Sequence, residues 1–353
     1  MRTAQSQGRG RKLLGHDVAA DTYSLSRLKA FAPKELGLGY PAESSHGKTT
    51  GAAMTVDSRT TSNTDYTGVA LALSCVGLYV AFHILSRYAA LERIGVPEMI
   101  ALRLGVAAVV LAPLLFVTKR PPIKFHRAVV LSIFGGLGFS VLAYSGLALS
   151  PASHGGVLMH GTLPLFAMIV GWALAGERFS FRKRWGGGLI VAGVVTIAAA
   201  GSATVSMRNA FGDALLLSAS LSWTLFGAFI RRYGIGAVVA AAVATTLAAA
   251  IYFPIYFLVY WDPNILDRVA VSQLVLQGIF QGVFIGAVSP IAYTATVERL
   301  GLSGTAFWMA AVPVLTTIAS VTLLGEELTA PLLLGVGLAT LGLYLALLKP
   351  RSR

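Results

Sequence analysis

The stretch PLFAMIVGWALAGE, residues 164–177, returns in altered form as PVLTTIASVTLLGE, residues 313–326. Each copy begins with proline, runs through mostly apolar residues and ends in Gly-Glu, and the copies lie 149 positions apart. Two glycines downstream of each copy keep the same offset: Gly188 and Gly193, then Gly337 and Gly342. Chance rarely preserves one register through so many positions, so the pattern indicates an internal duplication.

The composition around these stretches is typical of a membrane protein. Of 353 residues, 55% are hydrophobic and only 12% are charged, and the mean hydropathy is +0.71. A soluble domain carries about 25% charged residues. The apolar residues also form runs of about 20, the length that a helix needs to cross a bilayer. We therefore expect an all-α polytopic membrane protein.

Ten apolar segments are expected to cross the membrane. They cover residues 67–88, 97–117, 128–149, 152–175, 185–202, 212–231, 236–260, 270–296, 303–324 and 330–348. The duplication divides them into two five-helix repeats, residues 67–202 and 203–348, followed by a basic cytoplasmic tail at 349–353. Short connections predict that neighbouring helices pack as antiparallel hairpins.

Residues 1–66 differ from the rest of the chain. They are rich in Ser, Thr, Gly and basic residues and lack the apolar core of a signal peptide. This composition predicts a disordered cytoplasmic tail. Translation from Met54 is an equally good interpretation. A transit peptide is disfavoured because acidic residues interrupt the positive charge: Asp17, Asp21, Glu35 and Glu43.

Basic residues gather in alternate connections, and this asymmetry predicts orientation. One side carries Lys119, Arg120, Lys124, Arg127, Arg178, Arg182, Lys183, Arg184, Arg231, Arg232, Arg299, Lys349, Arg351 and Arg353, whereas the other carries Arg93, Arg208 and Arg268. The positive-inside rule then makes both termini cytoplasmic. The net charge of +13 belongs to this pattern, so no nucleic-acid partner is expected.

An odd number of spans in each repeat has a consequence for topology. The second repeat must enter the membrane from the opposite side, which puts Glu177 and Glu326 on opposite sides. Inverted repeats with a binding site at their interface are a recurrent plan of secondary transporters, because the two halves can exchange inward-open and outward-open conformations. We therefore expect ten transmembrane helices as two inverted five-helix repeats.

Further residues complete a pattern known from one transporter family. Pro97 and Arg103 open the second span, and Gly212 and Asp213 precede Trp223 in the sixth. With the two Pro…Gly-Glu stretches, residues 67–348 resemble the EamA branch of the drug/metabolite transporter superfamily. The resemblance implies a bacterial inner-membrane protein that exports or exchanges small metabolites, amino acids or drugs. It also implies a central cavity lined mainly by spans 1, 3, 4, 6, 8 and 9, with spans 5 and 10 peripheral. The second repeat departs from the pattern because no arginine matches Arg103.

Basic side chains inside the spans are the first candidates for a substrate site. Arg103 lies six residues into its span, where a charge is costly and usually functional. Snorkelling to the outer surface or an ion pair with Glu98 is the alternative interpretation. His160 precedes Pro164 by one turn, where the proline frees a backbone carbonyl. A neutral histidine bonded to a neighbouring helix is equally consistent. His83 is a further candidate for the same cavity.

Polar and aromatic side chains supply the remaining candidates. Tyr144 and Tyr293 are related by the duplication and predict paired cavity hydroxyls. Gln277 and Gln281 share one helical face, and their amides bind either a neighbouring helix or the substrate. Trp223 and Trp308 lie away from helix ends, as core residues or as a stacking wall for the substrate.

Glu177 and Glu326 are interpreted as structural, together with Pro164 and Pro313. They stand beside glycine at helix ends, where pairing with basic neighbours such as Arg178 would hold the loop. No other Asp or Glu lies in the middle of a span, which disfavours a carboxylate proton relay.

Catalytic, metal and cofactor chemistry find little support in the sequence. Gly301-Leu302-Ser303-Gly304 resembles the serine motif of rhomboid proteases, yet all six histidines precede Ser303. His154 and His160 are six apart, a spacing that does not suit zinc on one helical face. Cys75 is the sole cysteine. We expect no catalytic residues, no metal and no cofactor. A channel, which needs polar stripes along several spans, is also disfavoured.

The sequence thus predicts a secondary transporter that exports or exchanges a small amphipathic metabolite by alternating access, with drug efflux as the alternative. Basic groups within the spans favour a substrate with a carboxylate, amino acids among them. The expected partners are this substrate, the lipid bilayer and a possible second copy of the chain. Such a homodimer would pack through glycines of spans 5 and 10: Gly187, Gly188, Gly193, Gly335, Gly337 and Gly342.

Overall fold

The computed structural model describes residues 65–117, 123–176, 179–200 and 207–347. These residues form helices and connecting turns, with no strand among them. Eight helical segments within them are long and apolar enough to cross a membrane. The fold class predicted from composition, a polytopic all-α membrane protein, is therefore confirmed. The predicted tails at 1–66 and 349–353 lie outside the described residues, apart from 65 and 66.

The first half of the chain forms five helical rods, two of which contain π-helical turns. The elements are α2 (Tyr66–Leu91), α3 (Val96–Val117), α4 (Phe125–Leu131) with η1 (Ser132–Gly136) and α5 (Leu137–Leu149), α6 (Ala152–Gly155) with η2 (Gly156–Gly161) and α7 (Leu163–Ala175), and α8 (Phe181–Ala200).

The second half begins with two long rods and then a longer, interrupted one. Its elements are α9 (Met207–Tyr233), α10 (Ala237–Ile255) with η3 (Tyr256–Tyr260), α11 (Ile265–Arg268), α12 (Val271–Gln277) with η4 (Gly278–Val288) and α13 (Ser289–Met309), α14 (Ala311–Leu324), and α15 (Ala330–Leu347). The expected boundary between spans 8 and 9 falls inside α13, where Gly301 leaves the helical conformation (φ 71°, ψ 168°).

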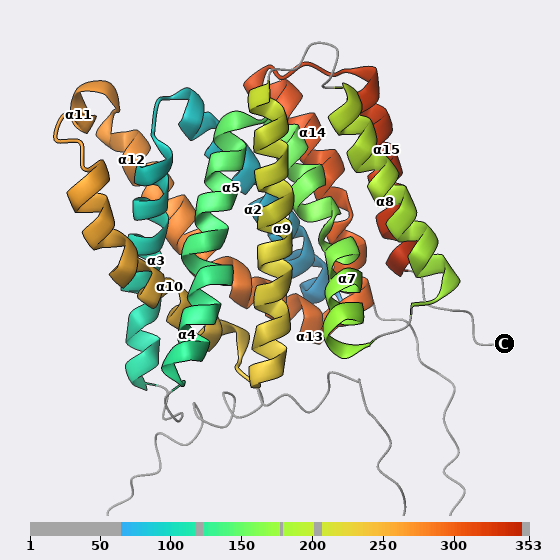
Figure 1. Ribbon diagram of the computed structural model, residues 1–353, viewed down its shortest axis with the longest axis horizontal. Helices are drawn as coiled ribbons and strands as arrows, with labels where there is room; N and C mark the ends of the chain where they lie inside the picture. The colour runs from blue at the N-terminus through green and yellow to red at the C-terminus, as the bar shows by residue number, and fades with distance from the viewer. Residues whose placement is uncertain (1–64, 118–122, 177–178, 201–206, 348–353) are drawn as a thin grey trace, which may run out of the picture. The chain divides into compact units, whose positions relative to one another are not determined.

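α8 and α15 correspond to predicted spans 5 and 10 but are not among the eight candidate spans. The apolar part of α15, Ala330–Ala346, is shorter than the others. α8 begins with the polar sequence Phe-Arg-Lys-Arg, which shortens its apolar part. The two helices pack side by side (Figure 1).

The duplicated Gly-Glu stretches end their helices in the same way. α7 ends at Gly176 with φ 64°, and α14 ends at Gly325 with φ 65°. This left-handed conformation is open to glycine without the clash that a Cβ atom causes, so glycine is the natural residue for both helix ends. The duplication seen in the sequence therefore has a matching backbone conformation at each copy.

The duplicated prolines stand close to the starts of helices. Pro164 occupies the first turn of α7, and Pro313 that of α14, where a missing N–H leaves no bond unmade. Immediately before α7 the chain forms the π-helix η2, and the turn at Thr162 separates the two. The loosened turn expected at His160 is thus part of a π-helix that ends in a break.

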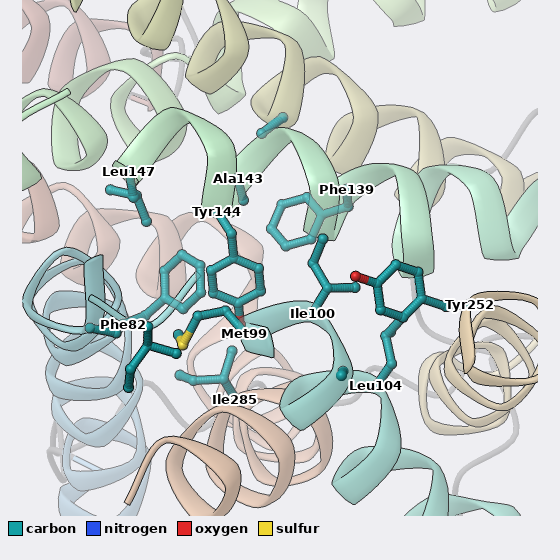
Figure 2. Close-up of a cluster of buried hydrophobic side chains, with 14 of the residues drawn as sticks. Phe82, Met99, Ile100, Leu104, Phe139, Ala143, Tyr144, Leu147, Tyr252 and Ile285 are labelled. Carbon is teal, nitrogen blue, oxygen red and sulfur yellow. The ribbon is translucent and has the colours of Figure 1, made fainter. Parts of the chain in front are cut away.

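The main apolar core lies between α2, α3, α5, α9 and α10. Figure 2 shows Phe82 of α2, Met99 and Ile100 of α3, and Phe139 and Tyr144 of α5 in this cluster. η4 packs onto α3 where Gly282 faces Val106 and Gly286 faces Ala107, positions with no room for a side chain. The core therefore surrounds the polar side chains described next.

Candidate functional site

Arg103 is a buried cation held between two aromatic rings. Only 6% of its surface is exposed. Its guanidinium carbon lies 5.3 Å from the centre of the Phe139 ring and 5.9 Å from that of Phe82, within the range of cation–π attraction. Its Nη1 has no hydrogen-bond partner among the described residues. The side chain therefore points into the core of the bundle rather than reaching the surface.

The ion pair considered between Arg103 and Glu98 is not present. Oε1 of Glu98 lies 3.7 Å from the guanidinium of Arg268, which also pairs with Asp262 at 2.7 Å. Within the described residues no carboxylate is paired with Arg103. Placing arginine at the centre of a membrane helix costs ~3 kcal/mol, and two cation–π contacts return only part of that because each is worth ~1 kcal/mol. A net positive charge is left in the core.

Tyr144 and Gln281 form a hydrogen-bonded network beside this charge. The Tyr144 hydroxyl donates to Gln281 Oε1 at 3.0 Å, and it also interacts electrostatically with Arg103. Gln281 Nε2 donates to Ser86 Oγ at 3.0 Å and to Gln277 Oε1 at 3.2 Å. Gln277 in turn donates to the backbone of α2 at Leu85. In this conformation both glutamines join helices.

His83 and His160 bind each other. Nε2 of His83 lies 2.8 Å from Nδ1 of His160, and the two rings are nearly perpendicular, at 87°. His83 is fully buried, and its other nitrogen, Nδ1, has no hydrogen-bond partner among the described residues. The two histidines therefore join α2 to η2 inside the bundle.

A line of contacts connects the histidine pair with the charge at Arg103. The ring of Phe82 lies 5.3 Å from that of His83 and faces Arg103 on another side. At the other end, the ring of Tyr79 lies 4.8 Å from that of His160. Five of the predicted site residues thus lie in one connected cluster: His83, Arg103, Tyr144, His160 and Gln281.

The two tryptophans have different positions. The Trp223 ring lies 5.0 Å from that of Phe139, so it borders the ring that covers Arg103. Trp308 contacts the adjacent ring of Phe307 at 5.8 Å and joins none of the contacts above. Tyr144 and Tyr293, although related by the duplication, are not paired: Tyr144 bonds to Gln281, whereas Tyr293 lies on α13.

Glu326 accepts hydrogen bonds from the first residues of α6 and, among the described residues, does not pair with a basic neighbour in the loop. Its carboxylate accepts hydrogen bonds from the backbone N–H of Ala152 at 2.6 Å and of Ser153 at 3.1 Å, and from the Ser153 hydroxyl at 2.9 Å. The amino end of a helix favours a negative charge, which explains the contact. Close by, His154 pairs with Asp213 at 2.9 Å. Glu177 lies outside the described residues.

Two surface hollows lie away from the cluster. One, of about 240 Å³, is lined by Phe181, Arg184, Trp185 and Gly188; the other, of about 350 Å³, by Val96, Ser145, Ala148, Leu149, Phe211 and Leu215. Neither is lined by a residue of the cluster. Among the described residues, no three His, Cys, Asp or Glu side chains gather as a metal site would require.

Some members of the cluster escaped sequence analysis. Tyr79, Phe82 and Ser86 were not singled out, although they lie three or four residues apart from one another or from His83 on α2. Helical spacing from His83 would have found Tyr79 and Ser86, because residues three or four apart share a face. Phe82, the immediate neighbour of His83, gives no such signal. Phe139 gave no such signal, since its contact with Arg103 depends on how α3 and α5 pack.

Comparison with known proteins agrees with this architecture. The sequence profile of the EamA-like transporter family matches residues 66–199 and again residues 210–348. A solved crystal structure superposes with a TM-score of 0.56 at 19% sequence identity, covering 79% of this chain and 98% of the other, which is a likeness of fold alone. Among curated proteins, none matches the sequence significantly. Because the two profile matches span most of the chain, it belongs to the EamA-like transporter family of the drug/metabolite transporter superfamily.

Proposed function

We propose that this transporter is a ten-helix alternating-access carrier for a small metabolite with a carboxylate group, which Arg103 binds. In this proposal the two halves are inverted repeats, both termini are cytoplasmic, and the protein exports or exchanges its substrate across a bacterial inner membrane. The buried charge of Arg103, without a carboxylate partner among the described residues, is the observation that carries the substrate class.

The contact of Glu326 supports the inverted arrangement. Glu326 follows α14 and binds the amino end of the rod made of α6, η2 and α7. Gly176 marks the carboxyl end of that same rod. The two equivalent Gly-Glu positions therefore stand at opposite ends of one rod, as inverted repeats require.

The packing of α8 against α15 supports ten spans rather than eight. The helices approach through glycine, because a Cβ on Gly193 would lie 2.6 Å from the carbonyl oxygen of Gly335, and one on Gly342 would lie 2.5 Å from that of Gly186. Small residues permit such close contact in membranes. α8 and α15, the last helix of each repeat, thus pair with each other. In the proposal each of them crosses the membrane as the fifth span of its repeat.

The chemistry of the cluster supports an anionic substrate. Arginine presents a planar fork of donors that matches a carboxylate, and Nη1 is free to donate. The rings of Phe82 and Phe139 beside it offer apolar contact to the remainder of a small amphipathic molecule. A cationic drug would meet repulsion from Arg103, which argues against the efflux of cationic compounds.

Counterflow in proteoliposomes tests the proposal. Vesicles containing purified protein would be preloaded with single compounds from a panel of L-amino acids, 2-oxo acids, neutral sugars and quaternary amines, and exchange of the labelled compound would be measured. We expect saturable exchange of at least one carboxylate, loss of more than about tenfold in Arg103→Gln, since a charged hydrogen bond is worth ~2 kcal/mol, and partial retention in Arg103→Lys.

Arg299→Gln is the matched control, because Arg299 is half exposed and pairs with Asp65 at the edge of α2. It should exchange like the unmodified protein. Exchange of only amines or sugars, or a carboxylate exchange that Arg103→Gln leaves unchanged, would remove Arg103 from the substrate site.

A further inference from the structure

The histidine pair has the geometry of a site for one proton. Two neutral imidazoles joined through His83 Nε2 and His160 Nδ1 place a single N–H between them. Adding one proton to His83 leaves that hydrogen bond intact, since the imidazolium donates Nε2–H and Nδ1 receives the new proton. A second proton would set two N–H groups against each other at 2.8 Å. The pair therefore accommodates one added proton and excludes two.

His83 Nδ1 is the nitrogen of this pair that can receive the added proton. It is buried and has no hydrogen-bond partner among the described residues, so one polar atom in the core remains unsatisfied. The backbone at Gly155 lies against it closely, because a Cβ there would stand 2.7 Å from Nδ1. A buried polar atom held open in this way costs ~1–3 kcal/mol and calls for an explanation beyond packing.

Titratable groups on the surrounding elements offer no counter-charge to an added proton. The neutral ones are Cys75, Tyr79 and Tyr88 of α2, Tyr144 of α5 and Tyr293 of α13; the cations are Arg87 of α2 and Arg103 of α3. The buried carboxylate of Glu98, also on α3, pairs with Arg268, and Glu298 and Arg299 of α13 are exposed. On α6 and α9, His154 and Asp213 bind each other, and Glu326 binds the start of α6. The described parts of η4 and α14 contain no titratable side chain. The basic residues of α8 and α9 stand near the ends of those helices, and Tyr344 lies on α15.

The charge balance then couples the proton to the substrate. A protonated pair beside Arg103 would put two positive charges in the core, whereas a carboxylate bound at Arg103 would leave the sum at one. Like charges repel strongly where the dielectric is low, so the bound anion favours the proton and the proton favours the anion. Two ligands that bind cooperatively move together in an alternating-access cycle.

We infer that His83 and His160 form a proton-binding site and that each carboxylate crosses the membrane together with one proton. The inference rests on the proposed carboxylate site at Arg103. With a 2-oxo acid, one proton and one monoanion move per cycle and the net charge transferred is zero, so the membrane potential does not drive the step. A zwitterionic L-amino acid that crosses with one proton transfers one positive charge. His160 lies in the π-helix η2, next to the break at Thr162, and such interruptions of the regular helix are frequent at functional sites.

Proton movement can be measured in the same proteoliposomes with the pH-sensitive dye pyranine trapped inside. Adding each L-amino acid or 2-oxo acid of the panel outside should acidify the lumen whenever that compound is taken up. We expect acidification to be lost in His83→Gln and in His160→Gln, while labelled counterflow continues. His160 is partly exposed, so its variant serves if His83→Gln does not fold. His126→Gln, an exposed histidine of α4, is the control and should acidify normally.

The outcomes separate the two proposals. Carboxylate counterflow without acidification in the unmodified protein would overturn the proton site and leave the carrier intact. If no panel compound exchanges, the carrier proposal fails, and ¹⁵N-histidine NMR of the purified protein then decides the proton site. One titrating histidine signal that disappears in both variants would support it; spectra that neither variant changes would overturn it.

Discussion

At the scale of single residues, Gly155 leaves the space that the His83 ring occupies, because glycine has no side chain. An added Cβ would stand 2.7 Å from both His83 Nδ1 and Leu147 Cδ2. We expect Gly155→Ala to lower the free energy of unfolding by ~1–3 kcal/mol, because extra volume in a packed core forces neighbours to shift. Thermal unfolding in detergent would show a lower Tm. Gly227→Ala is the control, since nothing lies within 4 Å of its Cβ position; an equal loss there would contradict the explanation.

Single residues also show what can be predicted from sequence alone. Arg103 and His160 stand out as candidates because a charge in a span, or a histidine one turn before proline, is unusual in lipid. The contacts of Arg103 could not be predicted in the same way. Its aromatic neighbour Phe139 lies on another helix, and Glu98, the expected ion-pair partner, pairs with Arg268. The type of a residue limits its roles, and the packing of helices selects among them.

At the scale of elements, Glu326 joins the start of α6 to the end of α14 through hydrogen bonds. Glu326→Gln removes the charge that accepts three hydrogen bonds, and charged hydrogen bonds are worth ~1.5–3 kcal/mol. We expect this variant to lower the free energy of unfolding by an amount in that range, measured as a lower Tm in detergent. Glu327→Gln, at the exposed neighbouring residue, should unfold like the unmodified protein. Equal behaviour of the two variants would show that the carboxylate of Glu326 contributes nothing to the helix start.

The contact between α8 and α15 makes a second prediction at this scale. Gly193→Ala would bring a Cβ within 2.6 Å of the Gly335 oxygen, so we expect it to cost ~1–3 kcal/mol of stability. Gly188→Ala, on the same helix but with nothing within 4 Å, should be neutral or gain up to ~1 kcal/mol from helix propensity. The Tm values of the two variants would check this difference. Gly193, Gly335 and Gly342 lie in the contact between α8 and α15 of one chain. A homodimer interface would therefore have to form through other glycines, such as Gly188 and Gly337.

At the scale of the whole molecule, the duplication was readable in the sequence, but the contacts that join the candidate residues were not. Gly176 and Gly325 could be matched because the backbone at a left-handed helix end selects glycine. Long apolar segments predicted most of the rods, since lipid requires them. The hydrogen bond between His83 and His160 joins α2 to η2. The two histidines are 77 positions apart, so no local sequence pattern predicts their contact.

The proposed inversion of the halves concerns the whole molecule, and two equivalent residues provide a test of it. Ser180 and Thr329 are 149 positions apart, follow the two Gly-Glu stretches and are exposed. In a Cys75→Ala background, which removes the sole cysteine, we expect a membrane-impermeant maleimide added to intact cells to label Thr329→Cys but to label Ser180→Cys only after permeabilisation. The reason is that the proposed ten-span arrangement puts five crossings between the two positions, and an odd number changes the side of the membrane. Labelling of both cysteines from the same side would mean that an even number of crossings separates them, and the halves could then not exchange roles in an alternating-access cycle.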